Sequence, residues 1–396
     1  MNQQRKKVLF IHHGSAYGGA PMSLLYTALG IKEHGYEPFV AMVQPSDDLR
    51  KLYNDNGIET FELSGFPRYF FWSSDNYRLY YPIAIKKILG AASKYTSGRE
   101  KLFLLLDSLK PDIVHLNSVT LVAAVSMMRG RTEELVWHIR EYGPKYKDFR
   151  WKYIQKQMMA TEKVIYLSEG ERKSWIERSD HGIVVNNFVN VNDFSAPDHR
   201  GKEKSILGVE NCFTLLYVGG LKKNKGPELL LETLNNLKKR GHKVKCLMPG
   251  AVTPEEARGE TIDAYASFLI ERINELKLND VCVRSPFSSD IRAFFVAADV
   301  LLFPAIFPHF ARPVIEASAM KIPVVVSNLE PLDELVIDNE TGFLAELSAE
   351  SFSDKLERLI KDPSLRTDMG LRGRKFALSH FDAEQQIRKI ANYYEG

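Results

Sequence analysis

The sequence has few cysteines, and their spacing excludes two classes of small domain. Only Cys212, Cys246 and Cys282 occur, and no two of them form a CxxC pair. Such a sparse, odd set provides neither a disulfide framework nor the paired ligands of a structural zinc site. We therefore expect a protein of a reducing compartment.

Long apolar runs are also absent. A membrane-spanning helix needs about 20 apolar residues, and the nearest run, 119–128, is interrupted by polar residues. The basic N-terminus has only a short apolar stretch, Val8 to Ile11, before His12, which is too short for the apolar region of a signal peptide. We therefore expect a cytoplasmic protein that is soluble or lies peripherally on the inner face of the membrane.

Cofactor and metal motifs are missing as well. No GxGxxG follows the first predicted strand, so a nicotinamide cofactor is not supported. No two histidines have the HxxxH spacing that places ligands on one helix face, and no acidic pair of DxD type ends a strand. We expect neither a metal nor an organic cofactor.

The composition is that of an ordinary globular protein of two domains. The 396 residues are 44% hydrophobic and 26% charged, enough for two cores of 150 to 200 residues each. Residues 1–190 hold 26 Lys and Arg against 20 Asp and Glu, and the remainder holds 27 against 30, so the net +3 is uneven. A basic N-terminal half favours an anionic partner; solvated surface charge is the alternative interpretation.

One segment of the N-terminal half is dense in aromatic residues. Residues 66–81, FPRYFFWSSDNYRLYY, interleave them with Arg68 and Arg78. Such a segment is typical of a peripheral membrane contact or a sugar-stacking surface. Packing against the next predicted helix, 83–95, is the alternative.

The stretch 299–342 predicts a unit of a parallel sheet. Residues 300–303 form a short apolar run typical of a buried strand, and 323–326 form another. Pro313 lies where a first helical residue is expected, which places Glu316 on the first turn of a helix. Ligands of open α/β sheets bind at the carboxyl ends of strands, and helix N-termini favour phosphate.

The same strand–loop–helix pattern recurs at the start of each half. A strand at 8–11 is followed by Gly18-Gly19 and a helix from Pro21, and a strand at 213–218 by Lys225-Gly226 and a helix from Pro227. Glycines at these turns allow a backbone to approach a ligand; a plain turn is the alternative. The alternation indicates an α/β fold with parallel sheets.

The stretch 304–325 resembles the C-terminal signature of glycosyltransferase family 4, retaining enzymes of GT-B fold. The matching positions are Pro304, Phe310, Pro313, Glu316 and 323–325. The family's first glutamate is replaced by Pro308, with His309 beside it, and its glycine by Ala311. Lys225-Gly226 matches the family's Lys-Gly, whereas Gly220 replaces its arginine. Gly18-Gly19 and His138 also fall at family positions.

The resemblance implies two Rossmann-like domains whose parallel sheets face a cleft. Residues 1–190 would be the acceptor-side domain, 191–378 the nucleotide-sugar-binding domain, and 379–396 a helix that crosses back to the first. The hinge would lie at 184–190, where Phe188 and Asn190 replace the family's glycine and aspartate.

The resemblance also implies roles for individual residues. Lys225 would stabilise the departing diphosphate, Glu316 would hydrogen-bond the ribose, and His138 would contact the donor sugar. His309 would take over part of the missing glutamate's role, and these four form the predicted catalytic set. The predicted donor-binding residues are Gly18, Gly19, Gly220, Phe310, Ala311, Arg312 and Glu316. The predicted acceptor-side residues are Tyr17, Arg140 and Glu141.

The function implied is retaining transfer of a sugar from a nucleotide-diphosphate sugar to a saccharide, lipid-linked or other acceptor, in surface polysaccharide or glycolipid biosynthesis. Pro308 and Gly220 motivate a rival interpretation, a non-catalytic GT-B subunit that scaffolds a partner transferase. A GT-B-like nucleotide-sugar epimerase is a third. The sequence does not identify the donor base, the sugar, the acceptor or the oligomeric state, and no contact with nucleic acid is expected.

Overall fold

This computed structural model describes residues 5–14, 18–68, 82–144, 147–176, 180–190, 193–194, 200–288 and 290–396. Most of the aromatic segment, 69–81, and the predicted acceptor-side residue Tyr17 lie outside the described residues. The chain divides into two compact units, one of 1–188 with 383–396 and one of 189–382. Each unit contains one sheet, and the segment after Asp382 belongs to the first unit.

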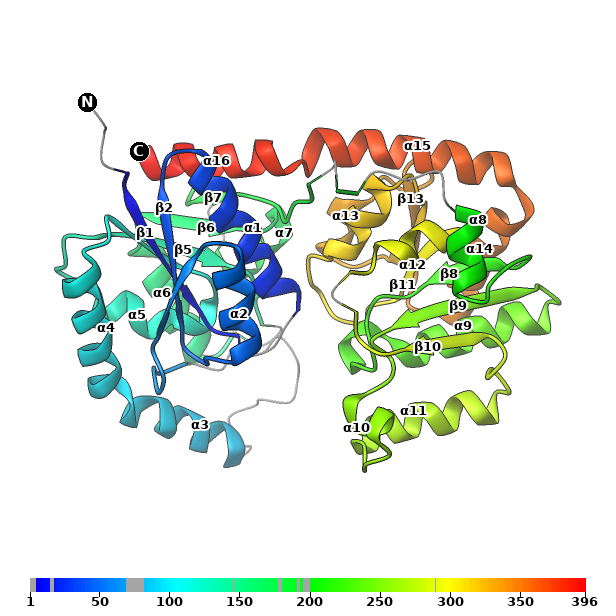
Figure 1. Cartoon of the computed structure of the whole chain (residues 1–396), viewed down its shortest axis with the longest axis horizontal. Coiled ribbons are helices and arrows are strands. Elements are labelled where there is room, and N and C mark those ends of the chain that lie inside the picture. The colour runs from blue at the N-terminus through cyan, green and yellow to red at the C-terminus, as the bar shows by residue number, and fades with distance from the viewer. Residues whose placement is uncertain are drawn as a thin grey trace. The chain divides into compact units, whose positions relative to one another are not determined.

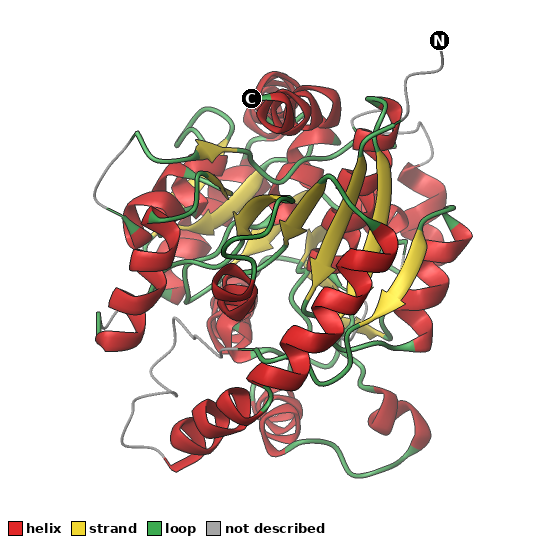
Figure 2. Ribbon diagram, turned by 90° about the vertical axis from the view of Figure 1, so that its left-hand side faces the viewer, coloured by secondary structure: helices red, strands yellow, loops and turns green. Residues whose placement is uncertain are grey.

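Unit 1 is a parallel α/β sheet with helices on both faces, as the strands (yellow) and helices (red) of Figure 2 show. Its strands pair in the order β3-β2-β1-β4-β5-β6-β7. The strands are β1 Lys7–His12, β2 Glu37–Met42, β3 Glu59–Glu62, β4 Ile113–Leu116, β5 Glu134–Ile139, β6 Lys163–Tyr166 and β7 Ile183–Val184. The helices are α1 Gly19–Glu33, α2 Asp47–Asp55, α3 Pro82–Ser93, α4 Tyr95–Leu109, α5 Val122–Met127, α6 Phe149–Met159, α7 Glu169–Trp175 and α16 Ala383–Glu395.

Unit 2 repeats this architecture with a sheet of order β10-β9-β8-β11-β12-β13, again all parallel (Figure 1). The strands are β8 Phe213–Leu216, β9 Val244–Pro249, β10 Cys282–Ser285, β11 Val300–Phe303, β12 Val324–Ser327 and β13 Gly342–Ala345. The helices are α8 Arg200–Ile206, α9 Pro227–Lys239, α10 Pro254–Arg258, α11 Ala264–Glu275, α12 Arg292–Ala297, α13 Arg312–Ala319, α14 Ala349–Lys361 and α15 Pro363–His380. The expected parallel α/β architecture is confirmed.

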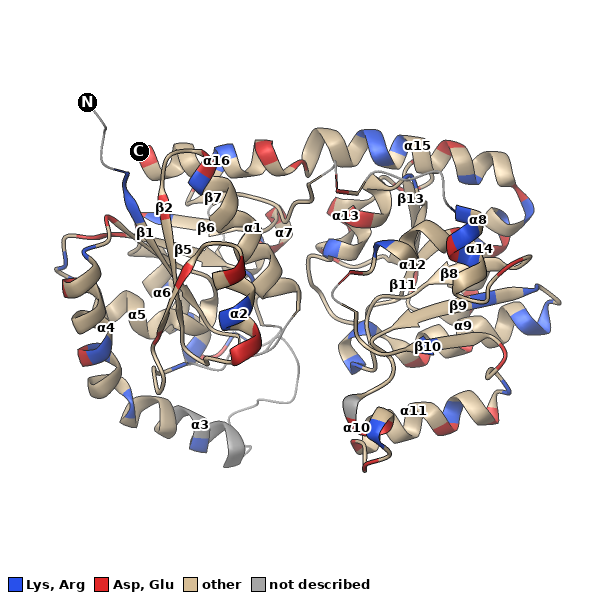
Figure 3. Ribbon diagram, in the orientation of Figure 1, with Lys and Arg blue, Asp and Glu red and all other residues tan. Residues whose placement is uncertain are grey.

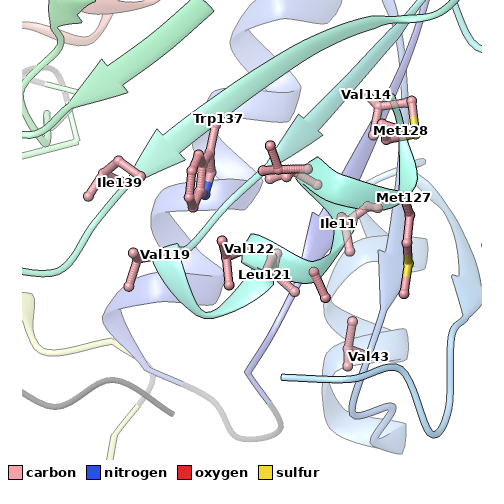
Figure 4. Packing of buried hydrophobic residues seen from close by; sticks show 14 of the residues in the cluster. Ile11, Val43, Val114, Val119, Leu121, Val122, Met127, Met128, Trp137 and Ile139 are labelled. Carbon is pink, nitrogen blue, oxygen red and sulfur yellow. The ribbon is translucent and has the colours of Figure 1, made fainter. Parts of the chain in front are cut away.

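Apolar side chains on both faces of each sheet build the cores. Figure 4 shows part of the cluster on one face of the unit 1 sheet, where Ile11, Val114 and Trp137 of neighbouring strands meet Val122 and Met127 of α5. All five side chains are almost fully buried. This rigid layer fixes the strand ends from which polar loops emerge.

Several predicted boundaries differ from the structure. The helix expected over 83–95 ends at Ser93, and a separate helix, α4, begins at Tyr95. The start of α4 is polar and shows no apolar period, so the pattern missed it. Tertiary contact explains it: a Cβ on Gly98 would lie 2.5 Å from Pro67, so only glycine allows this close packing. Asn339, in the turn before β13, has a positive φ of 61°.

Charged residues of both signs are interspersed over the two units (Figure 3), for example on α2 and α11. None of the helices in the described part of the chain is long and apolar enough to cross a membrane.

Candidate functional site

Both sheets contain a point at which the chain reverses its winding direction. In unit 2, β9 and β10 lie on one side of β8, and β11 to β13 lie on the other side. The reversal is therefore between β8 and β11. In unit 1 the reversal lies between β1 and β4. Open α/β sheets bind ligands at the carboxyl ends of the strands beside such a point. The predicted site residues lie at these two edges.

The loops after β8 and β11 pack closely against each other, and a glycine, Gly226, lies at the point of contact. Gly226 has φ +67°, and a Cβ on it would lie 1.9 Å from the carbonyl oxygen of Pro304. The N–H of Ile306 donates to the carbonyl of Asn224 at 3.3 Å. A side chain at position 226 is therefore excluded, and the loop carrying Lys225 is held against the loop carrying His309.

Lys225 and His309 meet directly at this edge. The Nζ atom of Lys225 lies 2.5 Å from Nε2 of His309 and 5.4 Å from the ring centroid of Phe303. The other imidazole nitrogen, Nδ1, lies 3.1 Å from the carbonyl oxygen of Phe307. The neutral tautomer with its proton on Nδ1 satisfies both contacts, because it donates to the carbonyl and accepts from the ammonium.

Burial shifts the pKa of both groups away from charge. Desolvation, followed by the charge of Lys222, lowers the pKa of Lys225 from 10.5 to about 7. Desolvation, followed by the charge of Lys225, lowers the pKa of His309 to about 3. An ammonium held partly desolvated, with no carboxylate among the contacts the structure gives it, is suited to receiving an anion.

Glu316 and Arg312 form a buried ion pair in α13. Because this helix begins at Arg312, Glu316 lies just beyond its first turn, and the prediction from Pro313 that it lies on that turn is wrong. Nε of Arg312 lies 2.8 Å from Oε1 of Glu316, and the two side chains are 11% and 7% exposed. Burial raises the pKa of Glu316, although Arg312 opposes the shift. The far end of α13 is fixed by Arg374 of α15, which donates to the carbonyl of Ala319.

The remaining predicted donor-binding residues of unit 2 shape the backbone. Ala311 is the N-cap of α13 and provides no side-chain acceptor for the N–H groups of the first turn. Phe310 is buried and packs edge-on against Phe381, with ring centroids 6.1 Å apart. Gly220 has φ +57°, and a Cβ there would approach the carbonyl of Gly250 to 3.0 Å. The backbone at 220 thus disfavours the arginine that the family pattern expects.

In unit 1, His138 ends a chain of buried polar contacts. Nδ1 of His115 lies 2.6 Å from the hydroxyl of Tyr394 on α16, and its Nε2 lies 3.3 Å from Nδ1 of His138. Burial lowers the pKa of His115 to about 3 and that of His138 well below its usual value, so both are neutral. Nε2 of His138 has no partner in the described part of the chain.

Arg140 and Glu141, which directly follow β5, have different hydrogen-bond partners. The guanidinium of Arg140 donates to Oδ1 of Asn187 at 2.5 Å and lies 3.5 Å from Oδ1 of Asn117. The carboxylate of Glu141 accepts from Oγ of Ser118 and, at 2.9 Å, from the N–H of Val119. Glu141 thus ties the end of β5 to the end of β4, whereas Arg140 carries its charge among polar side chains.

Two histidines that the sequence pattern did not single out complete this edge. His12 is the last residue of β1 and His13 follows it. Nδ1 of both and Nε2 of His12 lack partners among the described residues. Burial lowers the pKa of His12 to about 3 and also lowers that of His13. Polar residues directly after a buried strand were the available signal. Gly18 and Gly19 begin the following loop-to-helix junction, and a Cβ on either would meet open space.

The predicted residues therefore form two groups within their own units. Unit 2 collects Lys225, His309 and the start of α13 at the β8–β11 edge, and unit 1 collects His138, Arg140 and Glu141 at the β1–β4–β5 edge. No cluster of three or more His, Cys, Asp or Glu residues that could hold a metal occurs where the structure describes the chain.

Known proteins resemble this chain both in sequence and in fold. Residues 200–376, most of unit 2, match the family model described as "Glycosyl transferases group 1". The capsular polysaccharide biosynthesis glycosyltransferase CapM of Staphylococcus aureus is 28% identical over 214 residues, 54% of each chain. The chain spans about half the length of the curated relatives it matches.

Solved structures match over nearly the whole chain. A glycosyltransferase from Rickettsia africae has a TM-score of 0.79 at 20% identity and covers 99% of this chain and 98% of its own. HepE of Anabaena, solved in complex with UDP, has a TM-score of 0.78 at 19% identity, with 98% of both chains covered. These likenesses confirm a GT-B fold with two Rossmann-like, parallel-sheet domains.

Proposed function

We propose that this protein is a glycosyltransferase that moves a sugar from a nucleotide-diphosphate sugar to an acceptor with retention of anomeric configuration, as in glycosyltransferase family 4. The observation that supports this best is the edge of unit 2 where Lys225 projects from the β8 loop beside the N-terminal end of α13. A partly desolvated ammonium and an uncapped helix start are two independent features that favour a diphosphate.

The chemistry required of this edge is stabilisation of a leaving group. As the bond between the anomeric carbon and the diphosphate breaks, negative charge grows on the phosphate oxygens. Lys225 and the first-turn N–H groups of α13 would stabilise that charge without a metal or a cofactor. A bound diphosphate would also raise the pKa of Lys225 above 7, because an adjacent anion favours the protonated amine.

Glu316 has the position to hold the ribose hydroxyls, but its carboxylate is engaged by Arg312 at 2.8 Å. A carboxylate has two oxygens and can accept from several donors, so the ion pair orients Glu316 and leaves it capacity for a hydroxyl. His309 uses one nitrogen for Phe307 and the other for Lys225. The first role of His309 is therefore to position Lys225. His309 can contact a donor sugar only when Lys225 turns toward the phosphate and leaves Nε2 of the imidazole free.

The setting we propose is surface polysaccharide or glycolipid assembly in the cytoplasm, with peripheral membrane contact. The named activity of CapM supports polysaccharide assembly, but this relative is covered only in part and leaves the acceptor open. The excess of basic residues in the N-terminal half supports the membrane contact.

A non-catalytic role as a scaffold for a partner transferase is the second candidate. Gly220 and Pro308 favour it, because they occupy positions where the resembled family has catalytic side chains. In this case the unit 2 edge would still bind nucleotide, but no sugar would be transferred.

A turnover assay separates the two candidates. The full chain is incubated with a panel of nucleotide-diphosphate sugars and saccharide or lipid-linked acceptors, and released nucleoside diphosphate is measured. Acceptor-dependent release, lost in Lys225→Met and kept in the exposed control Lys239→Met, supports the transferase. The product's anomeric configuration, read by NMR, tests retention. Nucleotide binding without release for every acceptor supports the scaffold instead.

A further inference from the structure

The carboxyl edge of the unit 1 sheet contains a group of polar atoms that the fold buries without satisfying. We call His12, His13, Asn117, His138 and Arg140 the histidine–arginine cluster. Within the described residues, atoms of the first four lack hydrogen-bond partners: Nδ1 and Nε2 of His12, Nδ1 of His13, Nδ2 of Asn117 and Nε2 of His138. A buried polar atom without a partner destabilises the fold, so this many at one place favour a ligand that would pair with them.

The cluster comes from three neighbouring strands and is continuous. His12 ends β1 and His13 follows it, Asn117 follows β4, and His138 lies near the end of β5 with Arg140 directly after that strand. The rings of His12 and His13 have centroids 5.3 Å apart, and the guanidinium of Arg140 lies 3.5 Å from the amide oxygen of Asn117. His12, Asn117 and His138 are at most 2% exposed.

The positive charge of Arg140 acts on every histidine of the cluster. It is one of the causes that lower the pKa of His12, His13, His115 and His138, after burial in each case. The carboxylate of Glu141 raises the pKa of His13 and is not among the causes that shift the pKa of the other three histidines. Glu141 itself is held by Ser118 and Val119. The one charge that acts on all of these histidines is therefore positive, although the histidines themselves are neutral.

The unpaired atoms can be donors. If the hydroxyl of Tyr394 donates to His115, and His115 to Nδ1 of His138, the remaining proton of His138 lies on Nε2 and points to the ligand. Asn117 Nδ2 donates in any case, and each neutral histidine after β1 has one N–H. A Cβ on Gly14 would lie 2.8 Å from Nε2 of His12, so the glycine keeps that edge of the ring uncovered.

We propose that the histidine–arginine cluster binds an anionic group, a carboxylate or a phosphate, carried by the sugar acceptor. Several N–H donors and one guanidinium match the acceptor-only oxygens of such a group, whereas the hydroxyl of a neutral sugar uses neither the positive charge nor so many donors. This inference rests on the proposed transferase function for the word acceptor, but the site itself belongs to unit 1 alone.

The test measures binding of small sugars to the full chain by intrinsic fluorescence. Trp137 and Trp175 donate to the carbonyls of Ser118 and Glu141, so they report on this edge. The ligands are glucuronate, glucose 6-phosphate, glucose and inorganic phosphate. We expect the two anionic sugars to bind at least tenfold more tightly than glucose, and the better of the two identifies the anion as a carboxylate or a phosphate.

Variants of Arg140 test whether the cluster causes the preference. Arg140→Gln should remove the tenfold preference, Arg140→Lys should retain part of it, and Arg50→Gln should leave it unchanged. Arg50 is an exposed residue of the same unit that pairs with Glu62, so its loss removes the same charge elsewhere. If Arg140→Gln does not fold, Asn117→Ala gives the second measurement, with a smaller loss expected.

Three results would overturn the inference. One is equal binding of glucose and the anionic sugars, another is an unchanged preference in Arg140→Gln, and the third is inorganic phosphate binding as tightly as the sugar phosphates, which would make this a free-anion site. Nucleotide binding to unit 2 is measured in parallel. If nucleotide binds but the sugar anions do not, the inference fails alone; if nucleotide fails to bind, the proposed function fails.

Discussion

Replacing Lys225 by methionine should raise the stability of the protein and lower its affinity for the donor. The side chain is similar in length, so the change removes the ammonium and little else. In the folded chain that ammonium is partly desolvated, contacts His309 and has a pKa lowered from 10.5 to about 7. A charged group that lowers the stability of the fold, as Lys225 does, is typical of a binding site, because the charge is needed to bind the ligand.

The size of the stability gain follows from the pKa. By linkage, a fall from 10.5 to about 7 corresponds to a folded state destabilised by about 4 kcal/mol at neutral pH. Lys225 retains some exposure, which screens the charge, and methionine loses the contact with His309. We therefore expect a net gain of about 1–2 kcal/mol.

The pH dependence has a definite sign. Between pH 7 and 10.5 the unfolded amine still holds a proton that the folded one has released, so the parent becomes more stable as pH rises. The variant lacks this term. The stability gain of Lys225→Met over the parent should therefore be largest below pH 7 and should disappear as the pH approaches 10.

Donor affinity should change in the opposite direction. A hydrogen bond to a charged group is worth about 1.5–3 kcal/mol, and protonating a half-ionised amine at pH 7 costs about 0.4 kcal/mol of it. The net loss of about 1–2.5 kcal/mol raises Kd about 5- to 70-fold. Above pH 7 the parent should lose up to about tenfold in affinity per pH unit as Lys225 deprotonates, whereas the variant should not.

Urea unfolding followed by circular dichroism at pH 6, 7 and 9 measures the stability, and calorimetry with a nucleotide-diphosphate sugar measures the affinity. Lys239→Met, which removes an exposed lysine from the end of α9, is the matched control and should change neither. A Lys225→Met protein that is less stable than the parent at pH 7 would refute the desolvation argument. Unchanged donor affinity would refute the phosphate role.

Four further outcomes are expected. Gly226→Ala should cost at least about 3 kcal/mol of unfolding free energy in urea titrations, because its Cβ would overlap a carbonyl oxygen, whereas Gly241→Ala, with positive φ but open space, should cost about 1. Calorimetric donor affinity should survive EDTA, and an absolute requirement for Mg²⁺ or Mn²⁺ would contradict the proposed site. Glu316→Gln should weaken binding of a nucleoside diphosphate about tenfold but spare its 2′,3′-dideoxy analogue, and equal losses would rule out the ribose contact. His309→Ala and Arg312→Ala should both slow transfer, because His309 positions Lys225 and Arg312 orients Glu316, with nucleotide affinity falling mainly in Arg312→Ala. Transfer at the parent's rate in both variants would exclude these roles.

Sequence patterns predicted the α/β class and the strands at 8–11, 213–218, 300–303 and 323–326, because these buried strands are short apolar runs between turn residues. The strand at 300–303 and the helix from Pro227 match β11 and α9. The pattern failed where tertiary contact decides, as at the polar start of α4, which depends on Gly98 packing on Pro67. It also placed the start of the first helix at Pro21, whereas α1 begins at Gly19.

Side-chain partners could not be predicted from motifs. The resemblance drew attention to Lys225, His309, Arg312 and Glu316, but not to the direct contact of the first two or the ion pair of the last two. The contact between Lys225 and His309 depends on how the loops after β8 and β11 fold against each other, which Gly226 makes possible. The ion pair of Arg312 and Glu316 lies within α13 at i,i+4 spacing, so the sequence did contain a signal for it. Similarly, nothing in the spacing of the sequence connects His138 to Tyr394, because the two are joined only when α16 packs on unit 1.

The central claim is that the edge of unit 2 at β8 and β11 binds the diphosphate of a nucleotide-sugar donor. A crystal structure of the full chain with a nucleoside diphosphate tests it most directly. We predict a terminal phosphate within hydrogen-bond distance of Lys225 Nζ and of the first-turn N–H groups of α13, with the ribose at Glu316. A nucleotide bound at another strand end, or no bound nucleotide from a panel of bases at saturating concentration, would contradict the account.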